Sequence, residues 1–310
     1  MPVDDNTKNS DAQPDDLSLK SSVRTIRARD GVELSVRVWT SAPPGQRGSQ
    51  FFCLPTIERT GREFESFAAE VCRKCPATVI ALDPRGRGRS SVGELGYAKD
   101  CDDLIDTLTG LGVDHAHFVA SGYGGLVGMS MAASRPGSVL SLTLLDGAPA
   151  IDATGLARLQ YFIRRHPSNP SREKALDRLS SHEAKQFPKA RPLDFERMLD
   201  AGHVQEPQGD SSYRPDMSEL YLKRLVTMDL SQGFAERWDL FEGFAGVPLL
   251  IIEPENSTIT SGNTFRKMVE TRRMARGATR HLKLPDQGST PVLAGKLAQA
   301  VAEFCIGPAA

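Results

Sequence analysis

The chain has 310 residues, with 38 lysines and arginines against 39 aspartates and glutamates, so its formal net charge is −1. This length accommodates one large domain with an insertion or two modest domains. The near-neutral charge excludes the strongly basic surface of a general nucleic-acid binder. No apolar run approaches the roughly 18 residues needed to cross a bilayer, and we therefore expect neither a nucleic-acid nor a membrane partner.

The first twenty residues form a polar segment with almost no apolar side chains. Such a segment cannot offset its ordering entropy by burial, which predicts a disordered tail over residues 1–20. It lacks the cationic start and apolar stretch of a signal peptide. The five cysteines are an odd number for a long chain and favour a reducing, cytoplasmic location over a disulfide framework. Cys72 and Cys75 are interpreted as helix residues rather than as half of a metal site.

Alternation of strands and helices begins after the tail. Two alternating runs, 22–29 and 33–40, flank Asp30-Gly31, a hairpin turn signal. Short apolar runs follow at 51–54, 77–82, 117–120 and 139–145, and helical periodicities at 62–73, 99–111 and 125–133 lie between them. Continuous apolar strands indicate burial on both faces, as in a parallel sheet covered by helices.

Residues 151–246 interrupt this pattern. The segment is richer in Arg, Asp, Ser and Pro, and it contains no run typical of a core strand. Helical stretches are predicted at 155–165, 171–180, 193–199 and 217–225. An insertion at this point would lie over the carboxyl edge of the sheet, where ligands bind in such architectures. We expect a helical cap over 151–246.

The α/β pattern resumes with apolar runs at 248–252 and, more weakly, 281–284, and it closes on an amphipathic helix at 291–304. The order of elements predicts an α/β fold: a mostly parallel central sheet of about eight strands flanked by helices. The core would comprise residues 21–150 and 247–310.

Four segments carry a family resemblance. They are His117–Val127 (HFVASGYGGLV), Asp83–Ser90 (DPRGRGRS), Leu54–Arg59 (LPTIER) and Phe234–Glu255. In their order they resemble the strand–elbow–helix segment, the turn after strand four, the oxyanion loop and the cap exit of the α/β-hydrolase superfamily. The likeness extends over about residues 23–305 and is closest to capped members of the esterase and epoxide-hydrolase type.

Members of that superfamily use a nucleophile, a histidine and an acid. The resemblance places Gly122 at the nucleophile position, in a register fixed by the preceding strand and by Gly124-Gly125. It places Thr258 at the acid position and Ser289 at the histidine position. Glycine preserves the positive φ that an elbow requires but has no side chain that could attack a substrate.

Three other residues could be considered for the triad, but none of them restores it. Ser121 lies one residue before the elbow position, so its side chain should point to the opposite face of the strand. His281 lies at the start of the last strand, the wrong end for catalysis. Asp146 is an alternative acid position after strand six, but no histidine is placed for it to orient.

The resemblance also indicates a binding site. The main-chain amides of Tyr123 and Ile57 would be the two oxyanion donors, with Thr56, Glu58 and Arg59 in the same loop. Donors in this arrangement bind a carbonyl or carboxylate oxygen, or water. For Glu58 and Arg59 we expect an ion pair at the surface.

The predicted cap supplies aromatic residues of a type that commonly lines an apolar pocket, namely Tyr161, Phe162, Tyr213 and Trp238, and we take Tyr161 and Trp238 as binding residues. It also supplies three histidines, His166, His182 and His203. Any of them could serve as a base, but solvent exposure is the expectation for each.

The sequence supports three functional hypotheses. The first is a non-catalytic pseudo-enzyme that binds a small apolar carbonyl-containing molecule or a protein partner. The second is an enzyme that uses displaced residues, such as a cap histidine or Asp286, in hydrolysis of small carbonyl or ester substrates or in lyase or isomerase chemistry. The third is an interaction protein that works through another surface. No motif for a metal or cofactor is found.

Overall fold

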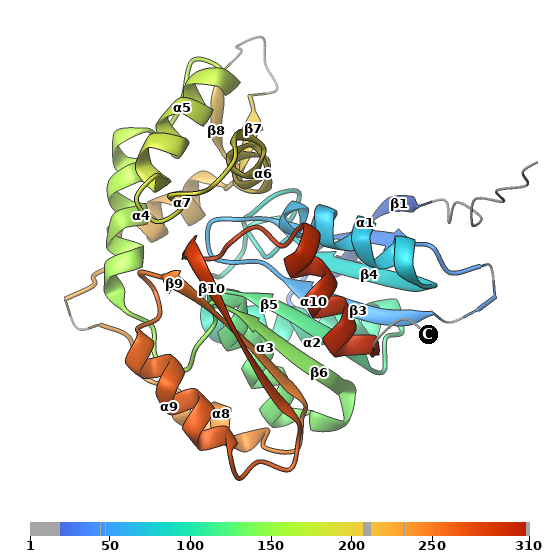
Figure 1. The fold of residues 1–310 in the computed structure, drawn as a ribbon. Coiled ribbons are helices and arrows are strands. Elements are labelled where there is room, and N and C mark those ends of the chain that lie inside the picture. The colour runs from blue at the N-terminus through green and yellow to red at the C-terminus, as the bar shows by residue number, and fades with distance from the viewer. Residues whose placement is uncertain (1–18, 44, 47, 207–211, 232, 308–310) are drawn as a thin grey trace, which may run out of the picture.

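The computed structural model describes residues 19–43, 45–46, 48–206, 212–231 and 233–307 (Figure 1). Nearly all of the predicted tail, residues 1–18, lies outside the described residues. Within the described ranges no helix is both long and apolar enough to cross a membrane.

The described residues form an eight-stranded sheet in the order β1-β2-β4-β3-β5-β6-β9-β10. The strands are β1 (Lys20–Arg27), β2 (Glu33–Thr40), β3 (Ser49–Leu54), β4 (Ala77–Leu82), β5 (Ala116–Ser121), β6 (Val139–Leu145), β9 (Leu249–Asn256) and β10 (Thr279–Gly288). β2 is antiparallel to both of its neighbours, and the other pairs are parallel. The predicted mostly parallel sheet is confirmed.

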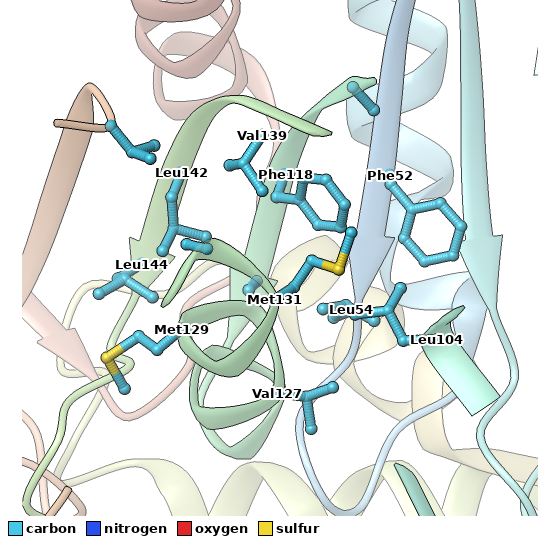
Figure 2. Close-up of a cluster of buried hydrophobic side chains, with 14 of the residues drawn as sticks. Phe52, Leu54, Leu104, Phe118, Val127, Met129, Met131, Val139, Leu142 and Leu144 are labelled. Carbon is cyan, nitrogen blue, oxygen red and sulfur yellow. The ribbon is translucent and has the colours of Figure 1, made fainter. Parts of the chain in front are cut away.

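Helices cover both faces of this sheet. One face carries α2 (Tyr97–Leu111), α3 (Tyr123–Ser134) and α9 (Gly262–Arg272), and the other carries α1 (Glu65–Lys74) and α10 (Gly295–Ile306). Short 3₁₀ turns, η1 (Gly61–Phe64) and η2 (Pro136–Ser138), precede α1 and β6. Neighbouring residues of β5 divide between the two faces. Phe118 packs with the α3 side, as Figure 2 shows, and Val119 packs with the α1 side. Burial on both faces explains the continuous apolar runs.

Most of the segment between β6 and β9 forms a group of helices beyond the carboxyl ends of the strands (Figure 1). It contains α4 (Ala153–Arg165), α5 (Arg172–Glu183), α6 (Pro192–Gly202), α7 (Glu219–Thr227) and α8 (Trp238–Gly243). It also contains a two-stranded antiparallel sheet, β7 (His203–Gln205) with β8 (Tyr213–Pro215). This small sheet was not predicted, because strands of three residues are too short to show alternation.

The end of that segment packs with the sheet. Phe241 of α8 and Phe244 just after it are buried in the cluster under α3. Because α8 contributes to the core in this way, the helices that stand over the carboxyl edge are α4 to α7.

Candidate active-site cavity

Gly122 is the single residue between β5 and α3. Its backbone angles are φ 46° and ψ −117°, a conformation that favours glycine. An ideal Cβ on this residue would lie only 2.4 Å from Thr56 Oγ1 and 3.0 Å from Thr290 Cγ2. The Thr56 hydroxyl therefore crowds the space that any side chain at position 122 would need.

Thr56 belongs to the loop after β3, which is held by buried contacts. Its amide donates to Glu63 Oε2 at 3.1 Å, and its carbonyl accepts a hydrogen bond from the Arg87 guanidinium. Its hydroxyl donates to Glu58 Oε2 at 3.3 Å. The backbone N–H and C=O groups of Thr56 are thus both fixed, and its hydroxyl is directed toward the Glu58 carboxylate.

Arg59 connects this loop to the opposite side of the site. Its Nη1 donates to Glu63 Oε1 at 3.1 Å and to the Thr290 carbonyl at 2.9 Å, while its Nε lies 3.7 Å from Glu58 Oε1. The expected surface location is wrong, since Arg59 is only 6% exposed. The covering element is α6, whose Ala201 carbonyl accepts from the Thr60 amide and hydroxyl. Burial raises the pKa of Glu63.

Ser121 is fully buried at the end of β5. Its hydroxyl lies close enough to the Glu63 carboxylate to lower that group's pKa, although burial outweighs this effect. Ser121 is not among the residues that line the cavity described below. The Ser121 side chain therefore does not reach the cavity, in agreement with the alternation expected of a strand.

Thr258 and Ser289 lie together after β9 and β10. The Thr258 amide donates to Ser289 Oγ at 2.8 Å, and the two hydroxyl oxygens are 3.1 Å apart. Gln186, which follows α5, brings its Oε1 within 3.3 Å of Ser289 N, 3.2 Å of Ser289 Oγ and 3.4 Å of Thr258 Oγ1. Sequence reasoning missed Gln186, because nothing in the residues around it marks a contact about one hundred positions away.

Asp146 is fully buried beside this network. Its Oδ1 accepts from Ser257 Oγ at 2.7 Å, and its Oδ2 accepts from the Thr290 amide at 3.0 Å. Burial raises the pKa of this carboxyl group to about 7. His281 lies on β10 with its Nε2 2.6 Å from Glu253 Oε2, away from the cavity-lining residues. The partners of Asp146 are thus hydroxyl and amide groups that join the ends of β6, β9 and β10.

A cavity of about 230 Å³ lies between the loop after β3, the start of α3 and the helices α4, α5 and α6. Its walls are mainly apolar, with Leu126, Leu156, Leu159, Phe162 and Ile163 among the lining residues. The predicted binding residues Thr56, Ile57, Glu58, Arg59 and Tyr123 all line it, as do Thr258 and Ser289. The structure therefore brings Thr258, Ser289 and the predicted oxyanion loop to one apolar cavity.

The two aromatic residues predicted for the pocket lie elsewhere. Tyr161 is 59% exposed, with the Arg165 guanidinium over its ring, and the next residue of α4, Phe162, lines the cavity instead. Successive residues of a helix point about 100° apart, so Phe162 faces the cavity while Tyr161 faces solvent. Trp238 packs at the start of α8 against the α3-side core, and Lys267 Nζ lies 3.9 Å from its ring centre.

Two of the three cap histidines line the cavity. His182 and His203 are half-buried there, which corrects the expectation of solvent exposure, whereas His166 does not line it. Burial lowers the pKa of each of these two imidazoles to about 4, so both are neutral at pH 7. The ring of His182 stacks on Phe162 with the centroids 4.6 Å apart.

Comparisons with known proteins agree with this architecture. A 3-hydroxybutyrate-oligomer hydrolase from Cupriavidus necator is 26% identical over 250 residues, which cover 77% of this chain and 82% of that protein. A putative carbamate hydrolase RutD from Yersinia enterocolitica is 31% identical over 112 residues, about a third of each chain.

Solved structures show the same fold. An alpha/beta hydrolase from Novosphingobium aromaticivorans superposes with a TM-score of 0.78 at 22% identity and covers 92% of this chain and 98% of that one. E-2-(acetamidomethylene)succinate hydrolase gives a TM-score of 0.69 at 21% identity, with coverage of 92% and 99%. The family model described as "Alpha/beta hydrolase family" matches residues 45–293. The chain belongs to the alpha/beta hydrolase family.

Proposed function

We propose that this protein lacks a working Ser-His-acid triad and binds a small apolar carbonyl-containing molecule in the cavity without turning it over. The observation that carries this proposal is the crowding at Gly122. A side chain there would meet Thr56 Oγ1 at 2.4 Å. A residue with a side chain could not replace Gly122 unless the Thr56 loop moved, and Glu63 and Arg87 hold that loop in place.

The region after β9 and β10 supports the same conclusion. Thr258 and Ser289 form hydrogen bonds with each other and with Gln186. Hydroxyl and amide groups of this kind do not accept a proton at neutral pH as an imidazole does. If Thr258 and Ser289 occupy the acid and histidine positions, this route has neither a general base nor the acid that would orient one.

The cavity indicates the class of ligand. Its apolar walls suit a short hydrocarbon skeleton, and the amides of Tyr123 and Ile57 are the candidate donors to a carbonyl oxygen. The Cupriavidus relative is named for hydrolysis of 3-hydroxybutyrate oligomers. Short 3-hydroxybutyrate esters are therefore the first ligands to test.

Calorimetry and thermal unfolding with dimeric 3-hydroxybutyrate methyl ester test the proposal. We expect saturable binding and a melting temperature that rises with ligand concentration, because the ligand binds only the folded state. Leu159→Trp, which fills part of the cavity, should abolish both effects. Steady-state cleavage of the ester should not exceed the rate in buffer.

Steady-state cleavage above the buffer rate would contradict the proposal. If His182→Gln also abolished that cleavage, the alternative of an enzyme with displaced chemistry would replace it. His182 is the group to change first, because it lines the cavity and its imidazole is neutral at pH 7.

A further inference from the structure

The Thr56 hydroxyl lies beside the point from which a side chain at position 122 would begin. Its distance of 2.4 Å from an ideal Cβ on Gly122 is the separation of two atoms bonded to a common neighbour. Thr56 also lines the apolar cavity. A nucleophilic oxygen is thus present at the elbow, although it comes from the loop after β3 and not from the elbow itself.

Two further groups needed for acyl transfer surround this oxygen. Glu58 Oε2 accepts its hydrogen bond at 3.3 Å, and catalytic hydrogen bonds of this length commonly shorten once a substrate binds. The amide of Tyr123 begins the twelve-residue helix α3, where the helix dipole favours negative charge. Hydroxyl, carboxylate and oxyanion donor therefore all border one cavity.

We propose that Thr56 Oγ1 is a displaced nucleophile, which accepts one acyl group from an activated ester or strained lactone bound in this cavity. This step rests on the cavity of the proposed function and adds a covalent reaction to it. The Thr56 oxygen forms a bond to the carbonyl carbon, and the bond from that carbon to the leaving oxygen breaks. The hydroxyl proton passes to Glu58 and from there to the leaving oxygen or to solvent.

The product explains why capture would stop after one acyl group. An activated donor, such as an aryl ester, transfers its acyl group to the threonine hydroxyl, which is a secondary alcohol. The product is an ordinary alkyl ester, which water attacks far less readily than the donor. The region that would hold a water-activating histidine carries Ser289, which Gln186 engages. The acyl group therefore stays on Thr56, and the protein is a covalent acceptor without turnover.

The experiment treats the full-length protein with p-nitrophenyl butyrate. Release of p-nitrophenolate should show a burst of one equivalent per protein followed by release at the buffer rate, the kinetic sign of acyl-enzyme accumulation. Intact mass should increase by one butyryl group, and peptide mapping should place it on Thr56. Thr56→Ser should retain the burst, Thr56→Val should lose it, and Glu58→Gln should slow it at least tenfold.

Thr109→Val is the matched control, because it makes the same change on the exposed surface of α2. It should leave the burst unchanged, and all variants are first checked for wild-type melting. A butyryl group on another residue, or an undiminished burst in Thr56→Val, overturns the inference. The absence of a burst, with binding of an unreactive amide analogue retained, overturns it and leaves the proposed function standing. Continued turnover that depends on Thr56 overturns the proposed function instead.

Discussion

The two sides of the cavity next to Gly122 and next to Ser289 are filled by different kinds of contact. On the elbow side, the Thr56 hydroxyl crowds the space beside Gly122. On the side formed by the ends of β9 and β10, Thr258, Ser289 and Gln186 close a hydrogen-bonded network. The contact at Gly122 is steric and the network at Ser289 is polar, so changing a residue on one side would leave the other side unchanged.

Arg59 joins the two sides, and its removal should have the largest effect. Arg59→Leu would break the contact with Thr290 and leave Glu63 buried without its cation. Loss of one partner from a buried pair typically costs about 3–5 kcal/mol. Urea unfolding should show this decrease in the free energy of unfolding.

Arg73→Leu provides the control for that experiment. Arg73 pairs with Glu70 on α1, but its side chain is 67% exposed. An exposed pair contributes less than about 1 kcal/mol. Equal losses for the two variants would show that burial of the Arg59 pair is not what makes it important.

Gly122→Ala should have the next largest effect. The new Cβ must tolerate φ 46° and a 2.4 Å approach to Thr56 Oγ1, which together should cost about 2–4 kcal/mol. Removing that hydroxyl with Thr56→Ala should recover part of the loss in the double variant. A double-mutant cycle measured by urea unfolding gives the coupling. Additive effects would show that the two residues do not crowd each other.

On the side formed by the ends of β9 and β10, the contribution of Asp146 can be tested through the pH dependence of the free energy of unfolding. Its folded pKa is about 7 against an ordinary value of 3.8, because burial disfavours the charged carboxylate. The folded state therefore binds the proton more tightly, and this group's contribution to stability is lost as the pH rises from about 4 to 7. Nearby Glu58 adds to the shift through its negative charge.

In the wild type this group changes the free energy of unfolding by up to about 1.4 kcal/mol per pH unit, and Asp146→Asn should remove that slope. Thermal unfolding from pH 4 to 8 measures the difference between wild type and variant. Asp177→Asn is the control, because a hydrogen bond from exposed Lys174 lowers the pKa of Asp177 and gives its contribution the opposite sign. An unchanged slope in Asp146→Asn would refute a buried, titrating carboxyl group.

Local patterns were sufficient to predict the sheet, and the family resemblance placed the elbow. The apolar runs marked the strands because both of their faces are buried, and the resemblance of residues 117–127 to a strand–elbow–helix segment placed Gly122 in the turn before α3. The same patterns could not place Arg59, which is buried because α6 folds over its loop. They also did not distinguish Phe162, which lines the cavity, from its neighbour Tyr161, since an aromatic side chain does not reveal the phase of its helix.

The sequence by itself determined the order of elements, the family resemblance and the residue types at the expected triad positions. Only the tertiary structure decided what fills the space they leave. Thr56 approaches Gly122 from 66 residues earlier in the chain, and Gln186 reaches Ser289 from 103 residues earlier. Such contacts depend on how loops from separate strands converge at one edge of the sheet, and periodicity, which reports only on near neighbours in the chain, carries no record of them.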